Sequence, residues 1–139
     1  MKFLKFKRHV VSRIKQLREN LKLTQQDLAQ KVGISRQTIY YLERGTYNPS
    51  ITLSLKIAEV FNKPTDEIFY LEPVIKSYVD NTSTGKIRKA LNKLNMEFDE
   101  LMNLTDMSDN ELTNTYTEEI CRQISKVLGT KFEDLFLIK

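Results

Sequence analysis

Apolar residues recur at helical spacing through most of the chain, and one stretch contains two such patterns back to back. Between Thr24 and Arg44 the apolar positions are Leu28, Ala29, Val32, Ile34, Ile39 and Leu42. This spacing turns one face of each helix inward. Thr24 and Ser35 stand where a side-chain oxygen caps a helix start, and Gly33 supplies the positive φ that a tight turn needs. The pattern predicts two short helices packed across a turn.

Further helices are predicted on both sides of this pair. Val10, Ile14, Leu17 and Leu21 recur on one helix face, preceded by a basic arm, MKFLKFK. After Gly45 and Pro49, Ser50 caps a largely apolar helix that Asn62 ends. A short last helix is expected from Thr65 to Tyr70. Together these make five helices.

The helical pattern stops at Glu72. Residues 73–79, PVIKSYV, are β-prone, and DNTSTG at 80–85 is turn-forming without a core residue. We therefore expect a domain at 1–72, a linker or short edge strand at 73–84, and a second domain at 85–139. Two interpretations of PVIKSYV remain open, an edge strand that pairs between subunits and an extended tether.

The second half repeats the pattern of the first. Shifted by 73, seven positions of the first half fall on Ile87, Leu94, Met96, Leu101, Met107, Ser108 and Leu112; shifted by 67, seven more fall on Thr117, Ile120, Ile124, Val127, Gly129, Leu135 and Phe136. Caps and core positions both return. The match predicts that 85–139 is a degenerate helix-turn-helix-like helical domain, and that the whole protein is all-α.

The outward side of the second predicted helix carries side chains suited to nucleic acid. Arg and Gln read base edges in the major groove, whereas donors around the helix ends bind phosphates. The candidates for base readout are Arg36, Gln37, Thr38, Tyr40, Tyr41 and Gln25; those for phosphate contacts are Gln26, Arg44, Thr46, Tyr47 and Asn48. In the second copy, Arg36, Gln37 and Thr38 become Asp109, Asn110 and Glu111, and phosphates would repel the two carboxylates. That copy is expected to keep the fold without binding DNA.

The distribution of charge also indicates that the first half binds DNA and the second half does not. Residues 1–72 hold 13 Lys and Arg against 7 Asp and Glu, whereas residues 85–139 hold 8 against 10. A basic domain attracts polyanions and gains affinity by releasing their counterions. The basic arm at 1–7 either contacts DNA phosphates or packs through Phe3, Leu4 and Phe6 on a partner chain.

Other function classes find little support in the residues. No apolar run approaches the roughly 20 residues of a membrane span, and the start of the chain does not resemble a signal peptide. We expect a cytoplasmic protein with no membrane partner. One Cys and one His permit no internal disulfide, make a metal site implausible and leave no nucleophile–base pair. Neither an enzyme nor a cofactor is expected.

The segment from Arg13 to Leu71 resembles the Cro and phage-repressor type of helix-turn-helix domain, the XRE family. The resemblance is carried by LTQ at 23–25, LAxxVGIS at 28–35, IxxLExG ending at Gly45, and NPS at 48–50. It implies a five-helix, lambda-repressor-like DNA-binding domain. It also implies a structural ion pair, because an Arg in the first helix of such domains meets a Glu at the end of the recognition helix; the matching positions are Arg18 and Glu43.

The function expected from these observations is sequence-specific binding of double-stranded DNA by a transcriptional regulator, a repressor acting as a homodimer on an operator with two half-sites. Residues 85–139 are expected to dimerise the protein or to bind a protein or peptide effector. The alternative is an antitoxin-like module, in which DNA binding serves autoregulation and the second half neutralises a partner protein.

Overall fold

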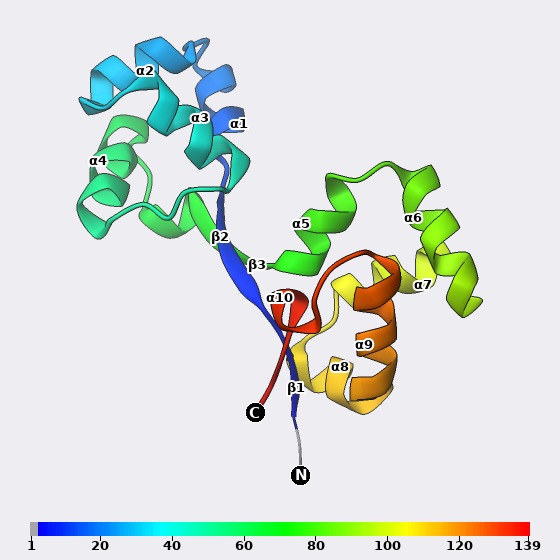
Figure 1. The fold of residues 1–139 in the computed structure, drawn as a ribbon. Coiled ribbons are helices and arrows are strands. Elements are labelled where there is room, and N and C mark those ends of the chain that lie inside the picture. The colour runs from blue at the N-terminus through cyan, green and yellow to red at the C-terminus, as the bar shows by residue number, and fades with distance from the viewer. Residues whose placement is uncertain (1–2) are drawn as a thin grey trace. The chain divides into compact units, whose positions relative to one another are not determined.

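The computed structural model describes residues 3–139, and the chain separates into two compact units (Figure 1). One unit is His9–Leu71, which we call the 9–71 unit. The other joins the described residues up to Arg8 with Glu72–Lys139, and we call it the composite unit. Among the described residues, no helix is long and apolar enough to span a bilayer.

The 9–71 unit contains four α-helices and a single 3-10 turn. They are α1 (Ile14–Asn20), α2 (Gln25–Val32), α3 (Arg36–Arg44), α4 (Ile51–Phe61) and η1 (Thr65–Glu67); β2 (Arg8–Ser12) pairs with β3 (Phe69–Pro73). Ser50 caps α4 by accepting a hydrogen bond from the Leu53 N–H, and Asn62 ends that helix in the left-handed conformation, as its pattern predicts. The core gathers one residue or more from each α-helix: Ile14, Leu28, Ala29, Val32, Ile39, Leu42, Ile57, Ala58, Phe61 and Ile68.

The composite unit is built from both ends of the chain. Its elements are β1 (Leu4–Phe6), α5 (Val74–Asp80), α6 (Thr84–Leu91), η2 (Asn92–Leu94), α7 (Phe98–Thr105), α8 (Asp109–Thr115), α9 (Glu118–Val127), α10 (Phe132–Leu135) and β4 (Phe136–Ile138). β1 and β4 form an antiparallel pair with Leu4 opposite Ile138 and Phe6 opposite Phe136. Leu4 and Phe6 are buried in the same core as Leu101 and Ile124.

The structure corrects two points about the N-terminal segment. Of the two alternatives for the arm, packing on a partner chain is wrong for Leu4 and Phe6, because these side chains are 5% and 2% exposed within their own chain, whereas Phe3 is 43% exposed. Val10 lies in strand β2 and not on the first helix, which begins at Ile14. Val10 and Val11 are β-branched, a type that packs well on a pleated surface once a partner strand is present. Residues 1–2 of the predicted arm lie outside the described residues.

The expectation of a linker or short edge strand at 73–84 is also wrong, because most of this segment is helical. Residues 74–80 form helix α5, in which Ile75 and Val79, four residues apart, are both buried. Ser83 then caps α6, which begins at Thr84. A short β-branched run can be a strand or a buried helix, and periodicity alone does not distinguish them. The last predicted helix, 65–70, is likewise shorter: η1 ends at Glu67, and Phe69 begins β3.

The elements of the two units follow the same spacing. Helix α7 begins and ends 73 residues after α2, and α8 begins 73 residues after α3. Helix α9, helix α10 and strand β4 each begin 67 residues after α4, η1 and β3, respectively. Positive φ angles recur at Lys22 and Asn95, and at Asn62 and Gly129. One turn differs, since Gly33 has a φ of 85° and Asp106 a φ of −96°.

Candidate nucleic-acid interface

Local hydrogen bonds define both ends of the turn between α2 and α3. The Asp27 N–H donates to Thr24 Oγ1 at 3.0 Å and the Thr24 N–H donates to Asp27 Oδ2 at 2.9 Å, a reciprocal capping box. The hydrogen bond from the Thr24 N–H holds the pKa of the Asp27 carboxyl below its ordinary value. Gly33, in the left-handed conformation, ends α2, and Ser35 caps α3 by accepting from the Thr38 N–H at 3.1 Å. The α2–turn–α3 prediction is confirmed.

Helix α3 presents one buried and one exposed side. Ile39 and Leu42 are buried. Arg36, Gln37, Tyr40, Tyr41 and Arg44 are exposed, so five candidate contact residues share the outward side of one helix. Thr38 differs from these, because it is partly buried and its Oγ1 lies 2.8 Å from the capping Ser35 Oγ.

The exposed side chains of α3 pair with each other one turn apart. Gln37 Nε2 donates to Tyr41 Oη at 3.1 Å. Arg44 donates to the Tyr40 hydroxyl, and its guanidinium lies 5.4 Å from the centre of the Tyr40 ring. These contacts restrict the rotamers of donors that are otherwise exposed. A restricted donor loses less conformational entropy when it binds a ligand.

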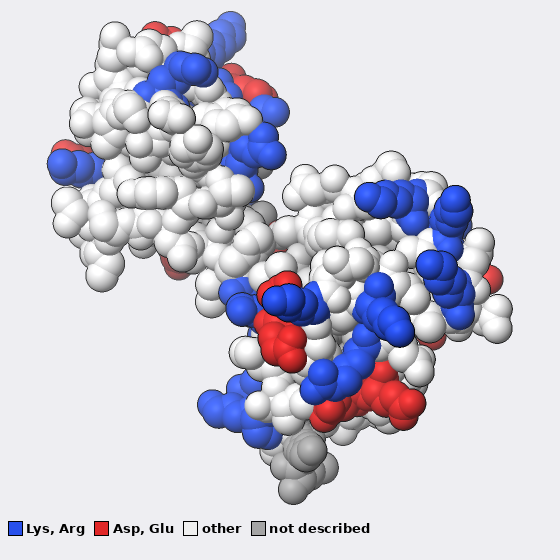
Figure 2. Space-filling view, viewed as in Figure 1, with Lys and Arg blue, Asp and Glu red and all other residues white. Residues whose placement is uncertain are grey.

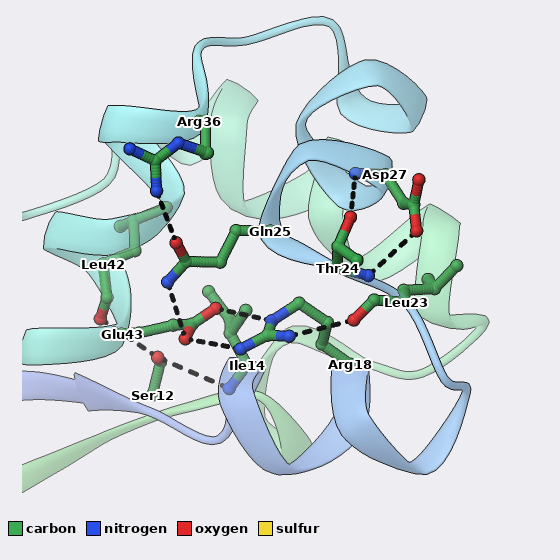
Figure 3. A network of polar contacts seen from close by, with 10 residues as sticks. All are labelled: Ser12, Ile14, Arg18, Leu23, Thr24, Gln25, Asp27, Arg36, Leu42 and Glu43. Carbon is green, nitrogen blue, oxygen red and sulfur yellow. Dashed lines mark hydrogen bonds and ion pairs between the residues drawn. The ribbon is translucent and has the colours of Figure 1, made fainter.

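A chain of polar contacts connects the first helix to the start of α3 (Figure 3). Arg18 Nε donates to Glu43 Oε2 at 2.9 Å and Arg18 Nη2 donates to Glu43 Oε1 at 3.1 Å. Gln25 Nε2 donates to the same carboxylate at 3.3 Å, and its Oε1 accepts from Arg36 Nη1 at 3.2 Å. Arg36 is therefore connected, through Gln25, to an ion pair whose two side chains are largely buried.

Burial makes the pair between Arg18 and Glu43 structural. Their side chains are 11% and 6% exposed. Arg18 also donates to the Leu23 carbonyl at 2.9 Å. Hydrogen bonding to Glu43 raises the pKa of the Arg18 guanidinium above its ordinary value, so Arg18 keeps its positive charge at neutral pH. The pair ties the end of α3 to α1 and to the residue before the α2 cap.

The candidate phosphate contacts surround the ends of α2 and α3. Gln26 is exposed in the first turn of α2, where backbone N–H groups and the helix dipole favour an anion. Arg44, Thr46, Tyr47 and Asn48 are all exposed, and the Thr46 hydroxyl donates to the Tyr41 carbonyl at 3.3 Å. Gly45, with a φ of 72°, lets the chain turn directly after α3.

Sequence reasoning missed one residue that supports this arrangement, Ser12, and the bridging role of another, Gln25. Ser12 Oγ donates to the Leu42 carbonyl at 3.2 Å, which ties the last residue of β2 to α3. A serine two residues before a helical pattern is a usable signal for such a role. Gln25 was expected as a base reader, but its bridging position between Glu43 and Arg36 depends on three helices meeting, which no local pattern reveals.

The folding of the chain also changes the charge distribution. The 9–71 unit has nine Lys and Arg against six Asp and Glu. The composite unit, which takes in the basic residues before His9, has thirteen against twelve. On the face shown in Figure 2, the composite unit accordingly carries both basic and acidic side chains. The 9–71 unit has the larger excess of positive charge.

Comparison with known proteins agrees with this geometry. A family model described as Helix-turn-helix matches residues 14–68. An uncharacterized HTH-type transcriptional regulator of Archaeoglobus fulgidus is 48% identical over 61 residues, which are 44% of this chain and 86% of that protein. Another, from Methanocaldococcus jannaschii, is 46% identical over 61 residues, 44% of this chain and 92% of that protein. The HTH-type transcriptional regulator ImmR of Bacillus subtilis is 28% identical over 124 residues, 88% of this chain and 91% of that protein.

The fold of the 9–71 unit and its exposed α3 define a helix-turn-helix protein. The chain belongs to the XRE family of HTH-type transcriptional regulators.

Proposed function

We propose that the protein binds double-stranded DNA in a sequence-specific manner and represses transcription as a homodimer on an operator with two half-sites. The observation that carries the proposal is the position of Arg36 and Gln37, exposed at the start of α3 directly after the Ser35 cap. The N-terminal residues of a recognition helix are those that contact base edges in the major groove. Arg pairs with guanine and Gln with adenine.

The other exposed residues complete a division of roles. Thr38, Tyr40, Tyr41 and Gln25 would contact bases next to those read by Arg36 and Gln37. Gln26, Arg44, Thr46, Tyr47 and Asn48 would bind phosphates and so set the register of the helix on the duplex. The similarity to ImmR extends over both units and so supports a regulator rather than an antitoxin.

A dimer explains how one short helix can specify a site. Two copies place equivalent helices about 34 Å apart, one turn of DNA, and double the number of bases read. The first turns of α4 offer apolar surface for such a contact, because Ile51 is 81% exposed and Leu55 is 57% exposed. We propose that the composite unit, which contains residues 85–139, contributes to dimerisation or binds a protein or peptide effector, as the second copy of a duplicated helix-turn-helix that no longer binds DNA.

To test the function, the full chain is used to select the DNA fragments of the source genome that it binds, and the selected fragments are then footprinted. We expect one motif with two related half-sites and protection of one face of the duplex. A reporter placed behind that motif should fall in activity when the protein is expressed. Recovery of fragments without a shared motif would contradict sequence-specific binding, and a rise in the reporter would contradict repression.

A further inference from the structure

The face of α8 that corresponds to the DNA-reading face of α3 is not open. By the spacing of 73 residues, Asp109 corresponds to Arg36 and Thr113 to Tyr40. Ser108 caps α8 as Ser35 caps α3, and here Glu111 completes a capping box. Arg36 and Tyr40 are exposed, whereas Asp109 and Thr113 are half-buried. The segment that covers them is the N-terminal strand β1.

Side chains of α8 hold the backbone of β1 on one edge. Thr113 Oγ1 accepts from the Leu4 N–H at 2.9 Å and donates to the Leu4 carbonyl at 2.8 Å. Asp109 Oδ1 accepts from the Phe6 N–H at 3.0 Å. Asp109 and Thr113 lie four residues apart and so occupy the same side of α8. The distance between them along the helix is close to the distance between alternate residues of a strand, which lets them bond to Phe6 and Leu4.

Strand β4 holds the other edge of β1. The Phe3 N–H donates to the Lys139 carbonyl at 3.1 Å, the Lys139 N–H donates to the Phe3 carbonyl at 2.9 Å, and the Lys7 N–H donates to the Leu135 carbonyl at 2.9 Å. The strand therefore lies in a groove between a helix and a sheet edge. Its backbone is recognised on both sides, without regard to side-chain identity.

The surroundings of the groove determine which side chains the bound strand can carry. Leu4 and Phe6 enter the core, where the Phe6 ring lies 5.9 Å from that of Phe136. Lys7 is exposed, and Lys5 is half-exposed. Arg8 Nη1 donates to both carboxylate oxygens of Asp109 at 3.1 Å. The groove thus fits apolar residues at alternate positions with basic residues between and after them.

We propose that this groove of the composite unit is a binding site for an extended peptide of alternating apolar and basic residues, built on the surface that reads DNA in the first copy and occupied by the chain's own residues 3–8. Main-chain hydrogen bonds supply affinity and the pockets for alternate side chains supply specificity, as in other sites that bind a peptide as an added strand. The site is separate from the DNA-binding proposal, since none of its residues belongs to the 9–71 unit.

The test uses the full-length chain carrying Leu4→Ser and Phe6→Ser, which empties the groove of its apolar anchors. A fluorescent peptide with the sequence of residues 1–8 should bind this variant at least tenfold more tightly than it binds the unaltered chain, whose groove is occupied. Adding Thr113→Val should weaken that binding at least fivefold. Asn114→Ala, at the exposed neighbouring position, is the matched control and should have no effect.

The register of the peptide gives a second control. A peptide with the same composition but with its apolar positions moved by one residue points every side chain to the wrong face and should not bind. Equal binding of the two peptides, or equal binding to the emptied and unaltered chains, would overturn the proposal.

A separate measurement covers the case in which the emptied variant does not fold. In the otherwise unaltered chain, Asp109→Asn together with Thr113→Val should speed amide hydrogen exchange of Leu4 and Phe6 at least tenfold, while Ile39 exchange stays unchanged. Unchanged exchange at Leu4 and Phe6 would show that α8 does not hold the strand, and would also overturn the proposal. Neither readout involves DNA, so a failure here is distinct from a failure of the proposed function.

Discussion

Arg18 and Glu43 form a bidentate ion pair, with distances of 2.9 and 3.1 Å, that joins α1 to the end of α3. Both side chains are almost fully buried, and each has an additional partner, the Leu23 carbonyl for Arg18 and the Gln25 amide for Glu43. Because the pair is satisfied on both sides, removing one member leaves a buried charge rather than a vacant surface position.

Arg18→Ala should therefore destabilise the protein by about 3–5 kcal/mol. Urea unfolding followed by circular dichroism measures the effect. Lys15→Ala, on the exposed side of the same helix, is the matched control and should change stability by less than about 0.5 kcal/mol. Arg13→Ala should fall between the two, because it loses the contact of Arg13 with the Tyr70 ring. Equal stabilities of all three variants would show that the pair contributes no more than a surface ion pair.

Arg36→Ala and Gln37→Ala should each cost about 1–3 kcal/mol of binding free energy on the operator and flatten preference at one base per half-site. Binding to random duplex DNA should change little. Arg44→Ala, at a proposed phosphate contact, should instead weaken both kinds of DNA and reduce the salt dependence of binding. Titrations at several salt concentrations distinguish the two patterns. Parallel losses on operator and random DNA for the Arg36 variant would reject base readout.

Gln25→Ala should reduce operator affinity in two ways, by removing the proposed base contact of Gln25 and by releasing Arg36, whose guanidinium donates to Gln25 Oε1. A double-mutant cycle measures this: the combined loss for Gln25→Ala with Arg36→Ala should be smaller than the sum of the single losses by about 0.5–3 kcal/mol. Additive losses would contradict the coupling, and would show that Gln25 does not position Arg36. Gln30→Ala, at an exposed position of α2, serves as the control.

Asp109 should contribute stability that disappears in acid. Burial favours its neutral form, but hydrogen bonds from Arg8 and the Phe6 N–H outweigh burial and, with the charge of Lys5 nearby, hold the pKa of the carboxyl below its ordinary value. A lowered pKa in the folded state stabilises the fold above the unfolded pKa of about 3.9, and the stabilisation is lost as pH falls through the folded pKa. Unfolding of the parent and of Asp109→Asn from about pH 7 to about pH 2 should show a stability difference that shrinks at the acid end. A constant difference would contradict the ion-pair origin.

Cys121 should be unreactive toward thiol reagents in the folded protein. Its side chain is fully buried, and burial raises the pKa of the thiol to about 12. A thiol reacts as the thiolate, so a disulfide reagent at neutral pH should modify Cys121 only as fast as the composite unit opens. Labelling in native buffer and in denaturant, followed by mass spectrometry, measures this. Rapid labelling in native buffer would show that the α9 region opens readily.

The chain outside the helix-turn-helix shows where local patterns mislead. PVIKSYV contains three β-branched residues in seven and favours a strand, yet the burial of Ile75 and Val79 makes it helix α5. Likewise, Val10 fits a helical period with Ile14 but pairs as part of β2. In both segments intrinsic preference is a fraction of a kcal/mol per residue, so packing of the apolar face decides the conformation.

The sequence by itself determined the α2–turn–α3 element, since its signals act within a few residues: the caps Thr24 and Ser35, the positive φ of Gly33 and the spacing of the apolar positions. The sequence also indicated that cap and core positions of the second half repeat the spacing of those in the first half. Only the tertiary structure decided the place of the N-terminal segment, because Leu4 lies opposite Ile138 and Phe6 opposite Phe136. Pairing between residues at opposite ends of the chain depends on assembly of the whole core. A three-residue strand is also too short for its hydrophobic pattern to predict which strand it pairs with.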